Sequence, residues 1–206
     1  MSEADWIGFA LAVLLIELTP GPNMAWLAAL SIGDGRRAGL AATTGIAIGL
    51  FVNALAAALG IAFIVSESDL LWQILRWGGA LFLLWLAWES WRDAGENSPA
   101  RVMATASPHR HFLSGMVVNL LNPKAMLFYV VVIPRFNGGQ VPGFGLAIAL
   151  ALTSIAIATV VHLSIVFAGS RVGGWIADPV RTRRVRRALA LAIVGVAFWF
   201  AVTAAR

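Results

Sequence analysis

Runs of about 20 apolar residues recur along the chain, and they constrain its fold more than any other feature. A run of this length is enough to cross a hydrocarbon layer of ~30 Å as a helix. Of the 206 residues, 60% are hydrophobic and 12% are charged, and the mean hydropathy of +0.83 lies outside the usual range for soluble domains. Because a lipid-facing backbone must satisfy its own hydrogen bonds, the sequence predicts an all-α integral membrane protein, with residues 1–206 in a single membrane domain.

Hydropathy and loop residues together predict six transmembrane helices, at residues 6–32, 39–65, 70–91, 112–133, 143–169 and 188–205. The loops at 33–38, 92–111 and 170–187 then share one side and hold two, three and six arginines. The other side has Arg135 and Arg206, and also Arg76 if that side chain reaches outward. The positive-inside rule therefore places both termini outside. The first residues, MSEADW, lack the basic region of a signal peptide, so we expect the first span to be retained.

The first predicted span is interrupted by the segment ELTPGPNMAW, residues 17–26. Residues 6–18 alone would form roughly 20 Å of helix, which is too short to cross. Pro20 and Pro22 lack amide hydrogens, and Gly21 tolerates dihedral angles that other residues avoid, so we expect the backbone to unwind here. Unwound backbone at membrane depth is tolerated only where protein or a water-lined cavity satisfies its polar groups.

A second interruption, NLLNPKAMLF at residues 119–128, falls in the fourth predicted span. Pro123 follows Pro20 by 103 residues, half the chain length, and each proline lies in the first span of a three-span half. Because three is odd, such halves insert in opposite orientations, as two inverted three-helix repeats with broken first and fourth helices. The halves would be about 1–91 and 112–206, linked by a cytoplasmic loop at 92–111. Two ordinary proline kinks are one alternative. Re-entrant hairpins at the two breaks are another, but on that topology the arginines would no longer be concentrated on one side of the membrane.

Charged and polar residues lie deep in these spans. Lys124 is 12 residues from the start of its predicted span and nine from the end, farther than its stem can reach. It must face a cavity, a partner or an unwound carbonyl. An ion pair with Glu17, which lies deep in the other broken span, is one interpretation, and binding of a transported anion or proton is the other.

The amides Asn23 and Asn122 flank the breaks and would either cap the half-helices or contact a solute. Asn53 is expected to hydrogen-bond between helices. His162 lies in the middle of the fifth span and could relay protons, although a lone histidine in a helix more often packs as a hydrogen-bonding residue. Gly45 and Gly49 form a GxxxG pair, which indicates a close helix contact within or between protomers.

The remaining charged segments indicate how the chain is oriented in the membrane, and we do not expect them to form a catalytic or binding site. The basic run RTRRVRR, residues 181–187, abuts a span, where arginines fix topology and attract anionic lipids, so we expect no nucleic-acid partner. The histidines of HRH, residues 109–111, are assigned to a solvated linker, with metal binding as the alternative. The chain has no cysteine, which excludes disulfides and thiolate metal sites, and no metal or other cofactor is expected.

The two breaks, together with GIAIGLFVNALAAALGIAFI (45–64), RWGGALFLLWLAWESWR (76–92) and FLSGMVVNLLNPKAMLFYVVVIPRF (112–136), resemble the LysE amino-acid exporter family in its RhtB, homoserine and threonine efflux, branch. This resemblance implies export of amino acids or their derivatives across the bacterial inner membrane, driven by protons without ATP. Matching the family's motifs residue by residue gives the following candidate site: Thr19, Pro20, Gly21, Pro22, Asn23, Asn122, Pro123 and Lys124. Glu17 is outside the motif, and Asn53 stands where related sequences often have histidine, so Glu17, Asn53 and His162 are weaker candidates.

We therefore expect a secondary active exporter that works by proton-coupled antiport and alternating access, and we expect no enzyme activity. Its partners would be an amino-acid substrate, protons and membrane lipids, and a homodimer through small-residue faces is compatible with the sequence. The alternative is a non-transporting membrane scaffold whose buried charges serve assembly.

Overall fold

The computed structural model describes residues 3–19, 21–60, 64, 67–93, 107–133, 136, 142–174 and 179–203. Within these ranges the regular structure is helical, as the unalternating apolar runs predict. The elements are α1 (Glu3–Leu18), α2 (Pro22–Gly33), α3 (Gly35–Ala58), α5 (Asp69–Asp93), α7 (Pro108–Leu120), α8 (Pro123–Leu127), the π-helix η1 (Phe128–Val132), α10 (Phe144–Gly174) and α11 (Pro179–Thr203).

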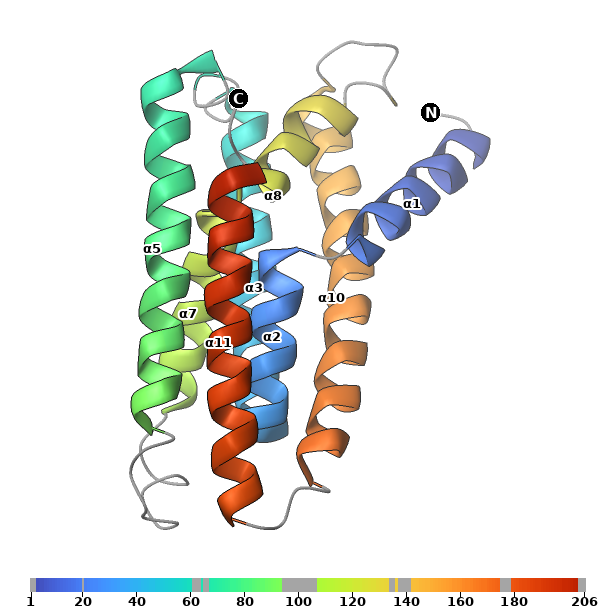
Figure 1. Cartoon of the computed structure of the whole chain (residues 1–206). Coiled ribbons are helices and arrows are strands. Elements are labelled where there is room, and N and C mark those ends of the chain that lie inside the picture. Colours follow the sequence, from blue (N-terminus) through green and yellow to red (C-terminus); the bar gives the residue numbers. More distant parts are fainter. Residues whose placement is uncertain are drawn as a thin grey trace.

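The long helices run alongside one another in an upright bundle, and α1 leans away from it (Figure 1). Among the described residues, α3, α5, α10 and α11 are each long and apolar enough to cross a membrane. The helices α1 and α2 make a fifth candidate, bent by 60° between them. The predicted fourth span consists of α7, α8 and η1, which are too short to count singly, so six crossings remain a prediction.

The first break does not turn the chain back on itself. The helix α1 begins at the end of the bundle where α11 ends, and α2 continues to the opposite end, where α3 begins (Figure 1). A re-entrant hairpin would bring α2 back toward the start of α1. The helices α1 and α2 therefore form no such hairpin, and the crossing that the arginine distribution indicates stays a prediction.

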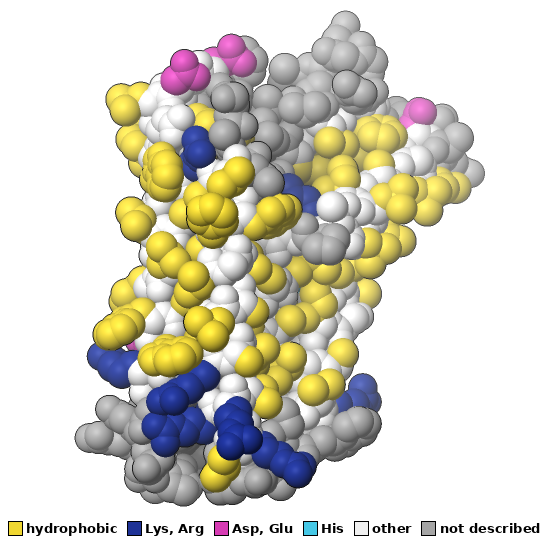
Figure 2. All heavy atoms as spheres, in the orientation of Figure 1, with side chains coloured by type: hydrophobic (Ala, Val, Ile, Leu, Met, Phe, Trp, Pro, Cys, Tyr) yellow, Lys and Arg dark blue, Asp and Glu magenta, His cyan; other side chains and the backbone are white. Residues whose placement is uncertain are grey.

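The surface in Figure 2 has the charge pattern of a membrane protein. Hydrophobic side chains cover the flank of the bundle, lysines and arginines gather mainly at the end where α11 begins, and acidic side chains gather at the other end. Many of the exposed side chains are large and apolar, as with Ile7, Leu15, Leu81 and Phe198, which are 63%, 67%, 62% and 72% exposed. An apolar flank of this kind suits hydrocarbon and not water, and the protein is a multi-pass membrane protein.

The helices α3 and α7 approach each other more closely than ordinary side chains allow. A Cβ atom added at Gly45 would lie only 1.9 Å from Phe112 O, and one at Gly115 would lie 2.2 Å from Ala42 O. The predicted GxxxG contact therefore forms within the chain, because only glycine leaves room for the opposing backbone. This glycine face of α3 is occupied, so a homodimer would have to use another surface.

Two predicted loops are partly helical. The HRH segment is predicted to lie in a linker, but in the structure it belongs to the first turn of α7. Ser107 accepts a hydrogen bond from His109 N, and Pro108 stands at the first helical position. His111 is buried. The loop assigned to 170–187 is shorter than predicted, because α10 extends to Gly174 and α11 begins at Pro179. The basic run at 181–187 is thus helical. Arginine has a high helix propensity, which hydropathy does not register.

Candidate functional site

A cavity lies where the two interrupted spans meet, and the space between its walls, including the part that is open to the outside, is about 550 Å³. Its walls come from the end of α1, the start of α2, the junction of α7 and α8, and the middle of α10, with a contribution from η1. Apolar side chains form much of the lining. The polar side chains that face it include Glu17, Asn23, Asn119, Asn122, Lys124 and His162.

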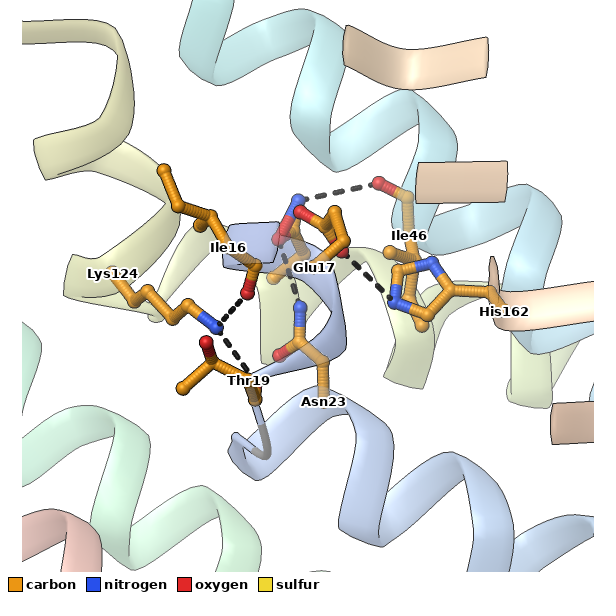
Figure 3. A network of polar contacts seen from close by, with 8 residues as sticks. Ile16, Glu17, Thr19, Asn23, Ile46, Lys124 and His162 are labelled. Atoms are coloured by element: carbon orange, nitrogen blue, oxygen red, sulfur yellow. Dashed lines mark hydrogen bonds and ion pairs between the residues drawn. The ribbon is translucent and has the colours of Figure 1, made fainter. Parts of the chain in front are cut away.

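The end of α1 is held by the lysine of the other break. Lys124 Nζ donates to Ile16 O at 2.8 Å and to Thr19 O at 2.9 Å (Figure 3). These carbonyls belong to the last turn of α1 and the residue after it, where helical partners run out. Of the arrangements open to Lys124, the structure shows two: its side chain lines the cavity, and its amine bonds carbonyls at the end of α1, of which that of Thr19 lies beyond the helix. This contact joins the two breaks directly.

The second break is organised by Asn122. Its Oδ1 accepts a hydrogen bond from Lys124 N at 3.0 Å, so Asn122 is the N-cap of α8. Pro123 occupies the first position of that helix, where a missing amide hydrogen costs nothing. Of the two roles left open for Asn122, capping is the one observed. At the first break Gly21 is the N-cap of α2 without a side-chain bond, and Pro22 again stands at the first position.

Asn119 connects the breaks to α3. Its Oδ1 accepts from Asn23 Nδ2 at 3.0 Å, and its Nδ2 donates to Ile46 O at 3.2 Å. Asn53 Nδ2 donates to the backbone oxygen of Asn119 at 3.3 Å. The side chain of Asn119 is fully buried. Asn53 therefore acts as the expected interhelical hydrogen-bonding residue, and it supports the break without lining the cavity.

Glu17 faces His162 and not Lys124. The distance from Glu17 Oε2 to His162 Nε2 is 3.8 Å, and Figure 3 shows the two side chains pointing toward each other from α1 and α10. The His162 side chain is only 4% exposed, whereas that of Glu17 is 22% exposed on the cavity side. Of the two interpretations of Lys124, the ion pair with Glu17 is not the one found, since the lysine amine is engaged by carbonyls and the carboxylate lies beside the imidazole of His162.

The structure brings most of the predicted site residues together. Gly21, Asn23, Asn122 and Lys124 line the cavity, as do the weaker candidates Glu17 and His162. Thr19 contributes its carbonyl oxygen, while its exposed hydroxyl donates back to Leu15 O. Pro22 is buried at the start of α2. Pro20 lies outside the described residues.

Three polar lining residues were not among the predicted site residues: Asn119, Tyr129 and Ser154. Asn119 carries a signal, since it stands three residues before the Asn122 cap. Tyr129 is the only tyrosine of the chain and lies in the π-helix η1 directly after α8. Such helices are rare and are frequent at functional sites, but nothing in the local sequence announces one.

A second cavity lies toward the basic end of the bundle, and the space between its walls, including the part that is open to the outside, is about 530 Å³. Two ion pairs lie in its wall, and the one formed by Arg186 joins the two halves of the chain. Arg186 Nη2 lies 3.0 Å from Asp34 Oδ1, and Arg110 pairs with Glu89. Among the described residues no group of three or more His, Asp or Glu could hold a metal ion.

The sequence matches a family model described as LysE type translocator over residues 14–204, nearly the whole chain. The chain belongs to the LysE family. The resemblance at the two breaks is thereby confirmed, and since the family consists of translocators, the protein is a transporter and not an enzyme.

Curated relatives cover most of the chain. It is 30% identical to a homoserine/homoserine lactone efflux protein of Salmonella typhimurium, over 89% of each chain. It is 27% identical to a leucine efflux protein of an Enterobacter species, over 92% of this chain and 89% of the relative. A threonine efflux protein of Salmonella typhi is 30% identical over 74% of this chain and 77% of its own length. No solved structure gives a significant match.

Proposed function

We propose that this LysE family member is a secondary exporter of amino acids or close derivatives, with protons moving in the opposite direction. The observation that carries the proposal is the cavity at the junction of the two helix breaks. It has a cation on one wall and a carboxylate on another, from Lys124 and Glu17, as a zwitterion requires. The efflux of homoserine, threonine or leucine named for the relatives supports this class of substrate.

Lys124 suits the carboxylate end of such a substrate. An ammonium group has three N–H donors, and two of those on Lys124 go to Ile16 O and Thr19 O. The third remains for a substrate carboxylate, and the start of α2, whose Gly21 and Asn23 line the cavity, adds a favourable dipole. The apolar lining favours a small or apolar side chain over a charged one.

The movement we propose is alternating access, in which one half of the chain moves against the other around this cavity. The contacts of Lys124 and Asn119 with the first half support two inverted three-helix repeats that meet at their breaks. The gathering of arginines at the end where α11 begins supports placing that end in the cytoplasm of a bacterial inner membrane, with both termini outside.

The proposal is tested by counterflow in proteoliposomes. Purified protein is reconstituted with an internal excess of homoserine, threonine or leucine, and uptake of the labelled compound is followed with and without a pH gradient. We expect exchange of at least one compound, and stimulation of net export by a gradient with acid outside. Failure of every compound to exchange would contradict the exporter.

Lys124→Ala separates the exporter from the scaffold alternative. We expect it to abolish counterflow while the protein still accumulates in the membrane. Unchanged counterflow would remove Lys124 from the mechanism. Loss of the protein itself, together with absence of counterflow in the wild type, is what an assembly role predicts.

A further inference from the structure

Two hydrogen-bond acceptors belong to residues that line the cavity near the first break, and neither is fully used. The Glu17 carboxylate lies 3.8 Å from His162, beyond ordinary hydrogen-bond length. Asn23 Nδ2 is committed to Asn119, but Asn23 Oδ1 accepts no hydrogen bond from any described residue although the side chain is 93% buried, at 7% exposure. A buried acceptor without a protein donor can accept a hydrogen bond from a group that enters the site.

The groups that surround Glu17 come from three elements. His162 faces it from α10, Lys124 lies near it on α8, and Tyr129 lies in η1 on the same cavity. The Lys124 amine is held by Ile16 O and Thr19 O, so it does not neutralise the carboxylate through a direct bond. The carboxylate is thus left to bind a proton or a cation that enters the cavity.

A substrate ammonium and a proton would both use this carboxylate. An ammonium carries three N–H donors, which match the Glu17 oxygens together with Asn23 Oδ1. A proton on Glu17 removes the negative charge that attracts the ammonium. Binding of one therefore opposes binding of the other, and such competition is a sufficient physical basis for antiport.

We propose that Glu17 binds the α-ammonium of the exported amino acid and the counter-transported proton in turn, with Asn23 Oδ1 completing the ammonium site and His162 positioning the carboxylate. On the cytoplasmic side the Glu17 carboxyl releases its proton to water, and the ammonium takes its place. On the outer side the ammonium leaves and a proton from water rebinds the carboxylate. This inference rests on the proposed function and adds to it the identity of the shared group.

The test measures apparent affinity against pH in the same proteoliposomes, without a gradient, for whichever of homoserine, threonine or leucine exchanges. At pH values low enough to protonate Glu17, the affinity of the wild type for the amino acid should fall by up to about tenfold for each unit by which the pH is lowered. Glu17→Gln should bind more weakly and lose this pH dependence while still exchanging. Glu67→Gln, at an exposed glutamate that does not line the cavity, should keep the wild-type profile. The N-acetylated form of the same amino acid, which lacks the ammonium, should not exchange.

A wild-type affinity that is independent of pH while counterflow is intact would overturn the shared site, as would a wild-type profile in Glu17→Gln. If the Glu17→Gln protein does not accumulate in the membrane, the pH dependence of affinity in the wild type and in His162→Gln tests the proposal instead. We expect His162→Gln to shift the midpoint of the profile without abolishing it, and an unmoved midpoint would exclude His162. Absence of counterflow at every pH would instead contradict the exporter proposal, and this inference with it.

Discussion

The contact between α3 and α7 allows a stability prediction whose size follows from the geometry. Gly45→Ala places a methyl carbon 1.9 Å from Phe112 O, whereas ordinary contacts begin at 3.4 Å. The opposing atom is backbone, so no side chain can rotate away, and the helices must separate. Overpacking of this kind costs about 1–3 kcal/mol. Alanine is favoured over glycine in a helix by about 1 kcal/mol, so a net loss would have to come from the close contact.

The assay is thermal unfolding of the purified protein in detergent, followed by the fraction that stays monodisperse on size exclusion. For a chain of this length, a loss of 1 kcal/mol lowers the melting temperature by roughly 2–4 °C. Gly195→Ala in α11 is the matched control, since nothing lies within 4 Å of its added Cβ, and it should be neutral or stabilising. Gly115→Ala strains the same interface against Ala42 O, so the double variant should lose less than the sum of the single losses. A Gly45→Ala protein that melts at or above the wild-type temperature would refute the reasoning.

Three further predictions concern polar contacts. Asn119→Ala leaves Ile46 O without its side-chain donor, so we expect a loss of about 1–3 kcal/mol in thermal unfolding and weaker counterflow; an unchanged melting temperature would argue against the network. Asn122→Ser keeps an N-cap oxygen and should retain counterflow that Asn122→Ala loses, whereas equal loss in both would indicate direct contact with the substrate. Arg186→Gln breaks an ion pair between the halves, so in this cysteine-free chain a Ser114→Cys probe in the second cavity should react faster with a maleimide; an unchanged rate would show that the pair does not restrain that end.

Much of the candidate site could be predicted from the sequence because its signals are local. The prolines of TPGPN and NPK remove amide hydrogens wherever they occur in a helix, and both breaks are found where those residues stand. The depth of Lys124 required a partner, and one of the options it left open, unwound carbonyls, is observed. The linker boundaries were wrong, since Ser107 and Pro108 start α7 earlier than hydropathy suggests.

Other parts of the site depend on residues far apart in the sequence. Nothing local indicates that His162 on α10 lies opposite Glu17 on α1, so the sequence offered an ion pair with Lys124 as one interpretation and did not offer the contact with His162. The role of Asn119 likewise depends on Asn23 and Ile46, which are 96 and 73 residues away. Tyr129 gains its place only because η1 follows α8 into the cavity wall.

The sequence by itself determined that the chain lies in a membrane, that it is helical, where the two breaks stand and to which family it belongs. Hydropathy, proline chemistry and motif spacing are all properties of single segments of the chain. The tertiary structure decided which polar atoms meet. It tied Lys124 to the end of α1, paired Glu17 with His162, and left Asn23 Oδ1 without a donor among the described residues. Such partners depend on how packed helices are rotated and shifted relative to one another. That arrangement is fixed by contacts summed over the whole bundle, such as the glycine face of α3 on α7, and not by the residues of any one span.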